Sequence, residues 1–194
     1  MVSDPAVSDP RRVLWINGAF GAGKTTTARL IRTRVPGSVI VDPEEIGSML
    51  RPVLQPVAPV RDFRAWNAWR ELVAATLNAV VRELPASGPR LAIVPQTITE
   101  EDHWSQITAA LHGDIQLVPV ALHVAADEHR RRALEDSEEP DALQWRLRRF
   151  EGFYGAAWIR TAFTGIDTTQ LSPSDTATAV QGLLDQEMNS GMPR

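Results

Sequence analysis

The chain has 194 residues, 43% of them hydrophobic and 23% charged, which is typical of a soluble globular protein with one full core. It contains no cysteine, and this excludes disulfides, a thiolate nucleophile and cysteine-based metal sites. A net charge of −4 gives no reason to expect nucleic acid as a partner, and no apolar run approaches a membrane span, so we expect a cytoplasmic protein.

Short apolar runs alternate with helical patterns along the sequence. We expect a flexible tail at residues 1–11 and one domain at 12–190, because only the tail shows a repeat, VSDP. Strands that are apolar throughout and alternate with helices predict a parallel sheet covered on both faces. Pro119 is a mild objection to the fourth strand. Predicted strands lie at 12–17, 38–41, 90–95, 115–124 and 162–168. Predicted helices lie at 24–34, 44–50, 61–84, 100–112, 127–136, 141–153 and after Ser172, and the proline-rich residues 51–59 are predicted as a loop.

The most specific motif, GAFGAGKT at residues 18–25, fits the pattern G-x-x-x-x-G-K-[ST]. Glycines let main-chain N–H groups turn inward, and the helix that follows offers unpaired N–H groups to a phosphate. Lys24, the only lysine of the chain, is expected to reach the terminal phosphates of ATP, and the Thr25 hydroxyl to ligate Mg²⁺. The alternative is a glycine-rich turn without a ligand, but the flanking strand and helix favour a phosphate cradle. The residues expected to contact ATP are Gly18, Ala19, Phe20, Gly21, Ala22, Gly23, Lys24, Thr25 and Thr26.

Other motifs separate the classes of P-loop proteins. A GTPase usually reads guanine with N-K-x-D, which is impossible here because no lysine lies beyond Lys24. A motor ATPase usually has an acid after the strand beside the loop strand, but Pro95–Thr97 contains none. Asp42 instead follows the second strand, where a kinase can use an acid to orient the acceptor hydroxyl. The alternative role for Asp42 is a turn or a helix cap.

Six arginines crowd residues 127–153, which we predict to be a helical lid that closes over ATP. Adjacent arginines on a helix cannot all face one site, so most of them are expected to be solvated or paired with acids. One arginine from each helix, Arg132 and Arg148, is expected to clamp the transferring phosphate.

A group of aromatic residues at helical spacing includes Phe63, Trp66 and Trp69, followed by Arg70. Core packing is one interpretation. The other is a flat wall beside an arginine, suited to a ring such as a nucleobase.

Four segments together resemble the tunicamycin-resistance proteins, a family of small P-loop proteins of the nucleotide-kinase type. They are WINGAFGAGKTTTA, VDPEEIGSMLR, DFRAWNAWREL and AIVPQTI, and the resemblance extends from Leu14 to about Ala179. It implies an ATP-binding protein that protects against tunicamycin, a uridine-containing nucleoside antibiotic with a fatty acyl tail. The motifs leave open whether such proteins phosphorylate the drug or only bind it.

We therefore expect a three-layer α/β P-loop NTPase fold like that of nucleoside and nucleotide kinases, with a five-stranded parallel sheet and a helical lid. The expected function is an ATP- and Mg²⁺-dependent phosphotransferase that acts on a hydroxyl of a nucleoside-like small molecule, as a monomer or homodimer. The alternatives are a protein that binds ATP and sequesters the drug unmodified, and a regulatory ATPase with a protein partner. The expected catalytic residues are Lys24, Asp42, Arg132 and Arg148. The expected acceptor-pocket residues are Asp42, Trp69, Arg70 and Gln96.

Overall fold

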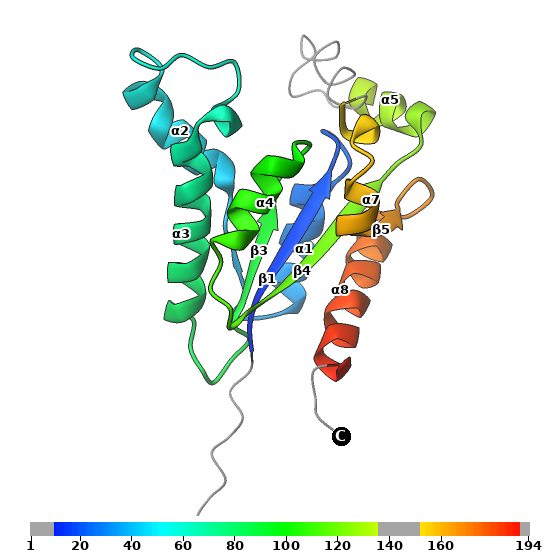
Figure 1. Ribbon diagram of the computed structural model, residues 1–194. Helices are drawn as coiled ribbons and strands as arrows, with labels where there is room; N and C mark the ends of the chain where they lie inside the picture. Colours follow the sequence, from blue (N-terminus) through cyan, green and yellow to red (C-terminus); the bar gives the residue numbers. More distant parts are fainter. Residues whose placement is uncertain (1–9, 136–151, 191–194) are drawn as a thin grey trace, which may run out of the picture.

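A single parallel sheet organises the computed structural model, which describes residues 10–135 and 152–190 (Figure 1). The strands lie in the order β2-β3-β1-β4-β5 and all their pairings are parallel. This confirms the predicted five-stranded sheet. The strands are β1 (Arg11–Gly18), β2 (Val39–Ile40), β3 (Leu91–Pro95), β4 (Ile115–His123) and β5 (Thr164–Asp167).

Helices cover both faces of the sheet, so the molecule has three layers (Figure 1). The alternation of side chains along β1 explains the layers, because Val13 and Trp15 enter one apolar cluster while Leu14 and Ile16 enter the other. The first cluster packs against α3 (Asn67–Glu83), α4 (Glu101–Ala109) and α7 (Ile159–Ala162). The second packs against α1 (Lys24–Arg34) and α8 (Pro173–Ser190).

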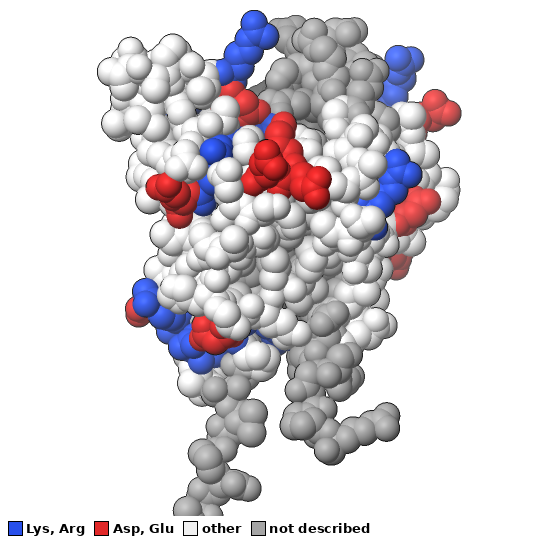
Figure 2. Space-filling view, viewed as in Figure 1, with Lys and Arg blue, Asp and Glu red and all other residues white. Residues whose placement is uncertain are grey.

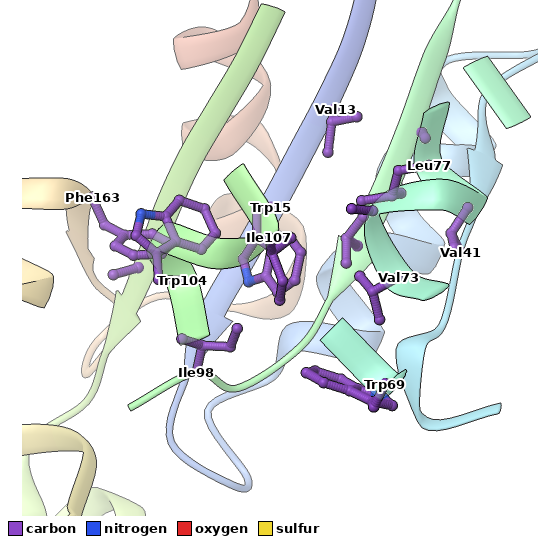
Figure 3. Packing of buried hydrophobic residues seen from close by; sticks show 14 of the residues in the cluster. Val13, Trp15, Val41, Trp69, Val73, Leu77, Ile98, Trp104, Ile107 and Phe163 are labelled. Carbon is purple, nitrogen blue, oxygen red and sulfur yellow. The ribbon is translucent and has the colours of Figure 1, made fainter. Parts of the chain in front are cut away.

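Aromatic side chains fill the core beneath α4 (Figure 3). Trp15 and Trp104 meet edge to face with ring centroids 5.2 Å apart, and Phe163 lies 4.5 Å from Trp104. Because Trp15 comes from β1, this packing fixes the strand that leads into the glycine-rich loop.

Two helix predictions need correction. Helix α2 (Pro43–Leu54) continues into the segment predicted as a loop. Pro52 lies in its last turns, and the helix tolerates it there, since Gln55 N–H still donates to Arg51 O beyond the proline. The helix predicted over 61–84 is instead a short 3₁₀ helix, η1 (Phe63–Ala65), followed by α3. The break occurs at Trp66, which has an extended backbone.

Pro119 does lie within β4, as the sequence predicted, and the pairing pattern explains how the sheet accommodates it. There β4 pairs with β1, whereas its pairing with β5 begins only at Val120. The ladder to β5 therefore loses no bond at the proline. Within the described part of the chain, no helix combines the length and apolarity needed to cross a bilayer.

Gly47 allows α2 to approach η1, and we expect the Gly47→Ala variant to be destabilised. A Cβ atom at Gly47 would lie 2.6 Å from Cγ of Phe63, whose ring also packs on Trp69. Overpacking of this kind costs about 1–3 kcal/mol, to be measured as a lower free energy of unfolding in urea. Gly182→Ala in α8 is the matched control, because nothing lies within 4 Å of its added methyl group. Equal stability of the two variants would contradict the expectation.

Candidate active site

The glycine-rich loop joins the end of β1 to the start of α1, at the carboxyl edge of the sheet. Gly21 and Gly23 adopt left-handed φ values of 78° and 91°, which side chains with a Cβ disfavour. When left-handed residues alternate with residues of negative φ, as Gly21 and Gly23 do with Ala22, successive N–H groups point into one concavity. The free N–H groups at the start of a helix such as α1 add to such a site. The loop therefore has the conformation of an anion-binding cradle.

The side chain of Lys24 folds back over this cradle. Its ammonium donates to Gly18 O at 3.1 Å and to Ala19 O at 3.0 Å. Desolvation is the main cause that lowers the pKa of Lys24 to about 8. The negative charges of Glu44 and Asp42 raise this pKa, and the positive charge of Arg64 lowers it. Main-chain carbonyls thus hold the ammonium of the only lysine against the glycine-rich loop.

The lowered pKa of Lys24 predicts a pH dependence of phosphate binding. Only the ammonium form attracts phosphate, so the affinity for ADP should be full below about pH 8 and should fall as the pH rises through the pKa, by up to tenfold per pH unit. Calorimetric titration with ADP from pH 6.5 to 9.5 measures the effect, and adenosine serves as the uncharged control. A flat ADP profile to pH 9.5 would contradict a lowered pKa.

Asp42 caps helix α2, which is the alternative role that the sequence analysis gave it. Its Oδ1 accepts the Glu44 N–H at 2.9 Å. The same carboxylate contributes to the electrostatic environment of Lys24. Capping therefore occupies one oxygen of Asp42 and leaves the charge beside the loop.

Glu44 interacts electrostatically with Lys24 and Asp42, although the sequence analysis gave it no role. Desolvation raises the pKa of Glu44, and the negative charge of Asp42 raises it further as the second largest cause. Its charge is also the strongest factor that raises the pKa of Lys24. The sequence signals for it were two successive acids at the start of a helix and its place in the segment VDPEEIGSMLR, which resembles the tunicamycin-resistance proteins.

A partly buried ion pair, Asp62–Arg64, lies within electrostatic range of Lys24. Arg64 is 6% exposed, donates from Nε and Nη2 to both oxygens of Asp62, and donates from Nη1 to Thr97 O at 2.9 Å. Its charge acts on Lys24 and on Glu44. The sequence prediction missed Arg64 because it assumed one continuous helix through this segment.

Three residues expected to line an acceptor pocket are buried instead. Trp69 is 0% exposed and its indole N–H donates to Pro43 O at 2.9 Å, so it supports the start of α2. Arg70 donates to Arg64 O at 2.6 Å and to Gln106 Oε1. Gln96 is 3% exposed and donates to Thr97 O at 3.1 Å. Direct contact of these three residues with a ligand, the role expected from the sequence, stays a prediction, and in this structure their side chains bond to other parts of the protein. They hold the residues around Lys24.

The segment after β3 is tied to the glycine-rich loop. Asn17 accepts from Gly18 N–H and Ile98 N–H and donates to Ile98 O, all within 3.0 Å. The Thr97 hydroxyl donates to Gly18 O at 2.7 Å, the same carbonyl that receives Lys24. Because Thr97 O also accepts from Arg64, this segment links the loop to the Asp62–Arg64 pair.

The surface beside this group is acidic. Figure 2 shows acidic side chains gathered over the amino-terminal end of α4. Glu100, Glu101 and Asp102 are exposed there. An anion approaching from this face would therefore meet negative charge.

A cavity of about 460 Å³ opens on the other side of the loop, which we call the base cavity. Its volume is typical of small-molecule sites. It lies between the start of α1, the start of α8 and α5 (Ala126–Glu135). Its lining includes Gly23, Thr26, Arg132, Thr169, Leu171 and Pro173. Sequence reasoning missed the wall formed by residues 169–173, because only the fold brings it to the loop.

Arg132 borders the base cavity. Its Nε donates to Glu128 Oε1 at 2.7 Å and its Nη2 to Thr168 O at 2.8 Å. Arg148 and most of the second lid helix lie outside the described residues. Thr25 and Thr26 are exposed at the start of α1.

A family model described as "AAA domain" matches residues 13–152. No curated protein is significantly similar to the chain. Similar solved structures include the tunicamycin resistance protein of Deinococcus radiodurans, with 24% identity, a TM-score of 0.66, and coverage of 91% of this chain and 95% of that one. A sugar kinase from Janibacter sp. HTCC2649 has 18% identity, a TM-score of 0.61 and the same coverages. The Mycobacterium tuberculosis APS kinase in complex with AMPPNP and APS has 21% identity, a TM-score of 0.51, and coverages of 91% and 99%. These likenesses confirm the P-loop NTPase fold.

Proposed function

The chain belongs to the AAA domain family of P-loop proteins, and on this premise we propose that it is an ATP- and Mg²⁺-dependent phosphotransferase for a hydroxyl of a nucleoside-like small molecule. One observation carries the proposal: the Lys24 ammonium lies over the glycine-rich loop, within the electrostatic influence of Asp42 and Glu44. A cation for phosphates and carboxylates for a hydroxyl are the two requirements of phosphoryl transfer.

On the nucleotide side, main-chain N–H groups within residues 18–26 bind the phosphates, apart from those of Gly18 and Ala22, which already donate to Asn17 Oδ1 and to Ala19 O. Lys24 exchanges its two carbonyl partners for the terminal phosphates and stabilises the charge that develops there. The base cavity receives the base and ribose, and Arg132 holds its edge. The APS kinase relative, which carries AMPPNP, supports a nucleotide in this fold.

On the acceptor side, Asp42 orients the attacking hydroxyl and accepts its proton. A bond forms between the acceptor oxygen and the γ-phosphorus, and the bond from that phosphorus to the β–γ bridging oxygen breaks, so ADP leaves. Glu44 and the Asp62–Arg64 pair, which interact electrostatically with one another, are the other charged groups near this carboxylate.

A magnesium ion fits this arrangement only together with the nucleotide. Among the described residues, no group of three or more His, Cys, Asp or Glu side chains could hold a metal ion. Mg²⁺ in such sites is held through substrate phosphates and few protein ligands, and the exposed Thr25 hydroxyl is the residue that would supply one. When bound, the ion neutralises phosphate charge.

The name of the Deinococcus radiodurans relative supports a tunicamycin-like acceptor. The second candidate function is sequestration of such a drug without chemistry. It is favoured by the capping bond that already engages one oxygen of Asp42.

Mass spectrometry of tunicamycin and of uridine, each incubated with the protein, Mg²⁺ and ATP, tests the proposal. The Lys24→Ala variant is the control. A phosphate added only by the unmodified protein is the expected result. Unmodified drug that stays bound to the protein would favour sequestration. If both compounds stay unmodified and unbound, nucleoside-like acceptors would be excluded from the proposed function.

A further inference from the structure

We propose that His129 is a positioning residue that holds the glycine-rich loop in its phosphate-binding conformation. His129 comes from α5, over a hundred residues away along the chain, and its Nε2 lies 2.6 Å from Phe20 O. The side chain is 1% exposed, so the ring is enclosed against the loop. This inference rests on the phosphate-binding role proposed above for the loop.

The identity of the partner atom determines the proton position. A carbonyl oxygen can only accept, so Nε2 carries the hydrogen and donates it to Phe20 O. In a trans peptide the C=O of one residue and the N–H of the next point in opposite directions. A carbonyl held toward His129 therefore directs the Gly21 N–H away from His129.

The ring also lies next to Gly21, at ordinary van der Waals distance from where a side chain would begin. A Cβ added at Gly21 would lie 3.8 Å from Nε2 of His129. Because Gly21 has no Cβ atom, its backbone can rotate more freely than that of another residue, and it adopts a left-handed φ of 78° here. A donor at this point limits that rotation and lowers the entropy lost when phosphate binds.

Helix α5 is itself anchored beside the base cavity. Thr169 Oγ1 accepts the Ala125 N–H at 2.9 Å, and Arg132, one turn beyond His129, donates to Thr168 O. The same helix therefore borders the base cavity and holds the loop. A base that fills the cavity and steadies α5 thereby also steadies Phe20 and Gly21.

His129 acts as a neutral donor and not as a further cation. Burial lowers its pKa, with smaller contributions from the charges of Arg132 and Lys24, while the bond to Phe20 O acts against them. The imidazole is thus neutral near pH 7, and attraction of phosphate remains the task of Lys24.

The test compares His129→Leu, which removes the donor, with His129→Gln, which places an amide N–H near the position of Nε2. His112→Leu is the control, because His112 is an exposed histidine whose structural bond uses its main-chain N–H. Thermal unfolding checks that each variant is folded. Binding of AMPPNP and of adenosine is measured by calorimetry, and amide hydrogen exchange is followed over residues 18–24 without ligand.

We expect His129→Leu to bind AMPPNP roughly tenfold more weakly, to bind adenosine as before, and to exchange faster across the loop. His129→Gln should restore all three values. Unchanged AMPPNP affinity and exchange in folded His129→Leu would overturn the inference. If the unmodified protein binds no nucleotide, the proposed function fails, while the exchange measurement still decides whether His129 holds the loop.

Discussion

The Asp42→Asn variant is expected to lose phosphoryl transfer by roughly 10²–10⁴-fold while its affinity for ATP stays close to that of the unmodified protein. Asparagine can still accept the Glu44 N–H and cap α2, so the helix should remain in place. It cannot accept the proton of the attacking hydroxyl. Turnover and ATP affinity, measured separately on the same preparation, reveal this split.

Glu45→Gln is the matched control for Asp42→Asn. Glu45 is exposed in the same first turn of α2, and removing its charge should leave turnover within a few fold of that of the unmodified protein. A protein that only sequesters its ligand would respond differently, because Asp42→Asn would reduce protection only as far as it reduced drug binding. Full turnover in folded Asp42→Asn would remove Asp42 from the chemistry.

Lys24→Ala is expected to have the second large effect, a loss of roughly 10²–10³-fold in turnover together with weaker binding of ATP. The variant removes the cation that the loop carbonyls hold over the phosphate position. Adenosine binding should not change, because the base cavity does not contain the ammonium.

Arg32→Ala provides the control for Lys24→Ala. It removes one positive charge from an exposed position on the same helix, α1, and should leave ATP affinity within a factor of two or three. If Lys24→Ala bound ATP as tightly as Arg32→Ala does, the loop would not be a phosphate site.

The fold could be predicted from the sequence because its signals are local. A buried strand, a loop with glycines at left-handed positions and a helix follow one another within residues 11–34. The alternation of apolar runs with helical patterns likewise indicated a parallel sheet, and the place of Asp42 after the second strand could be read directly from the sequence. In each case the deciding residues are neighbours along the chain.

The rest of the candidate site depends on contacts between distant segments. Helical spacing showed that Trp69 and Arg70 lie near one helix face, but it could not show that the break at Trp66 buries both and turns Arg64 toward Thr97. Likewise, the sequence placed His129 in a helix without indicating which carbonyl it meets.

By itself, the sequence determined the family of the protein, its sheet and its phosphate loop, because these depend on short patterns of backbone conformation and apolarity. Only the tertiary structure decided what surrounds the loop: the base cavity formed with residues 169–173, the Asp62–Arg64 pair and the bond from His129 to Phe20. The physical reason is that burial and hydrogen bonding depend on which distant segments pack together, and packing fixes those partners only when the whole sheet has formed.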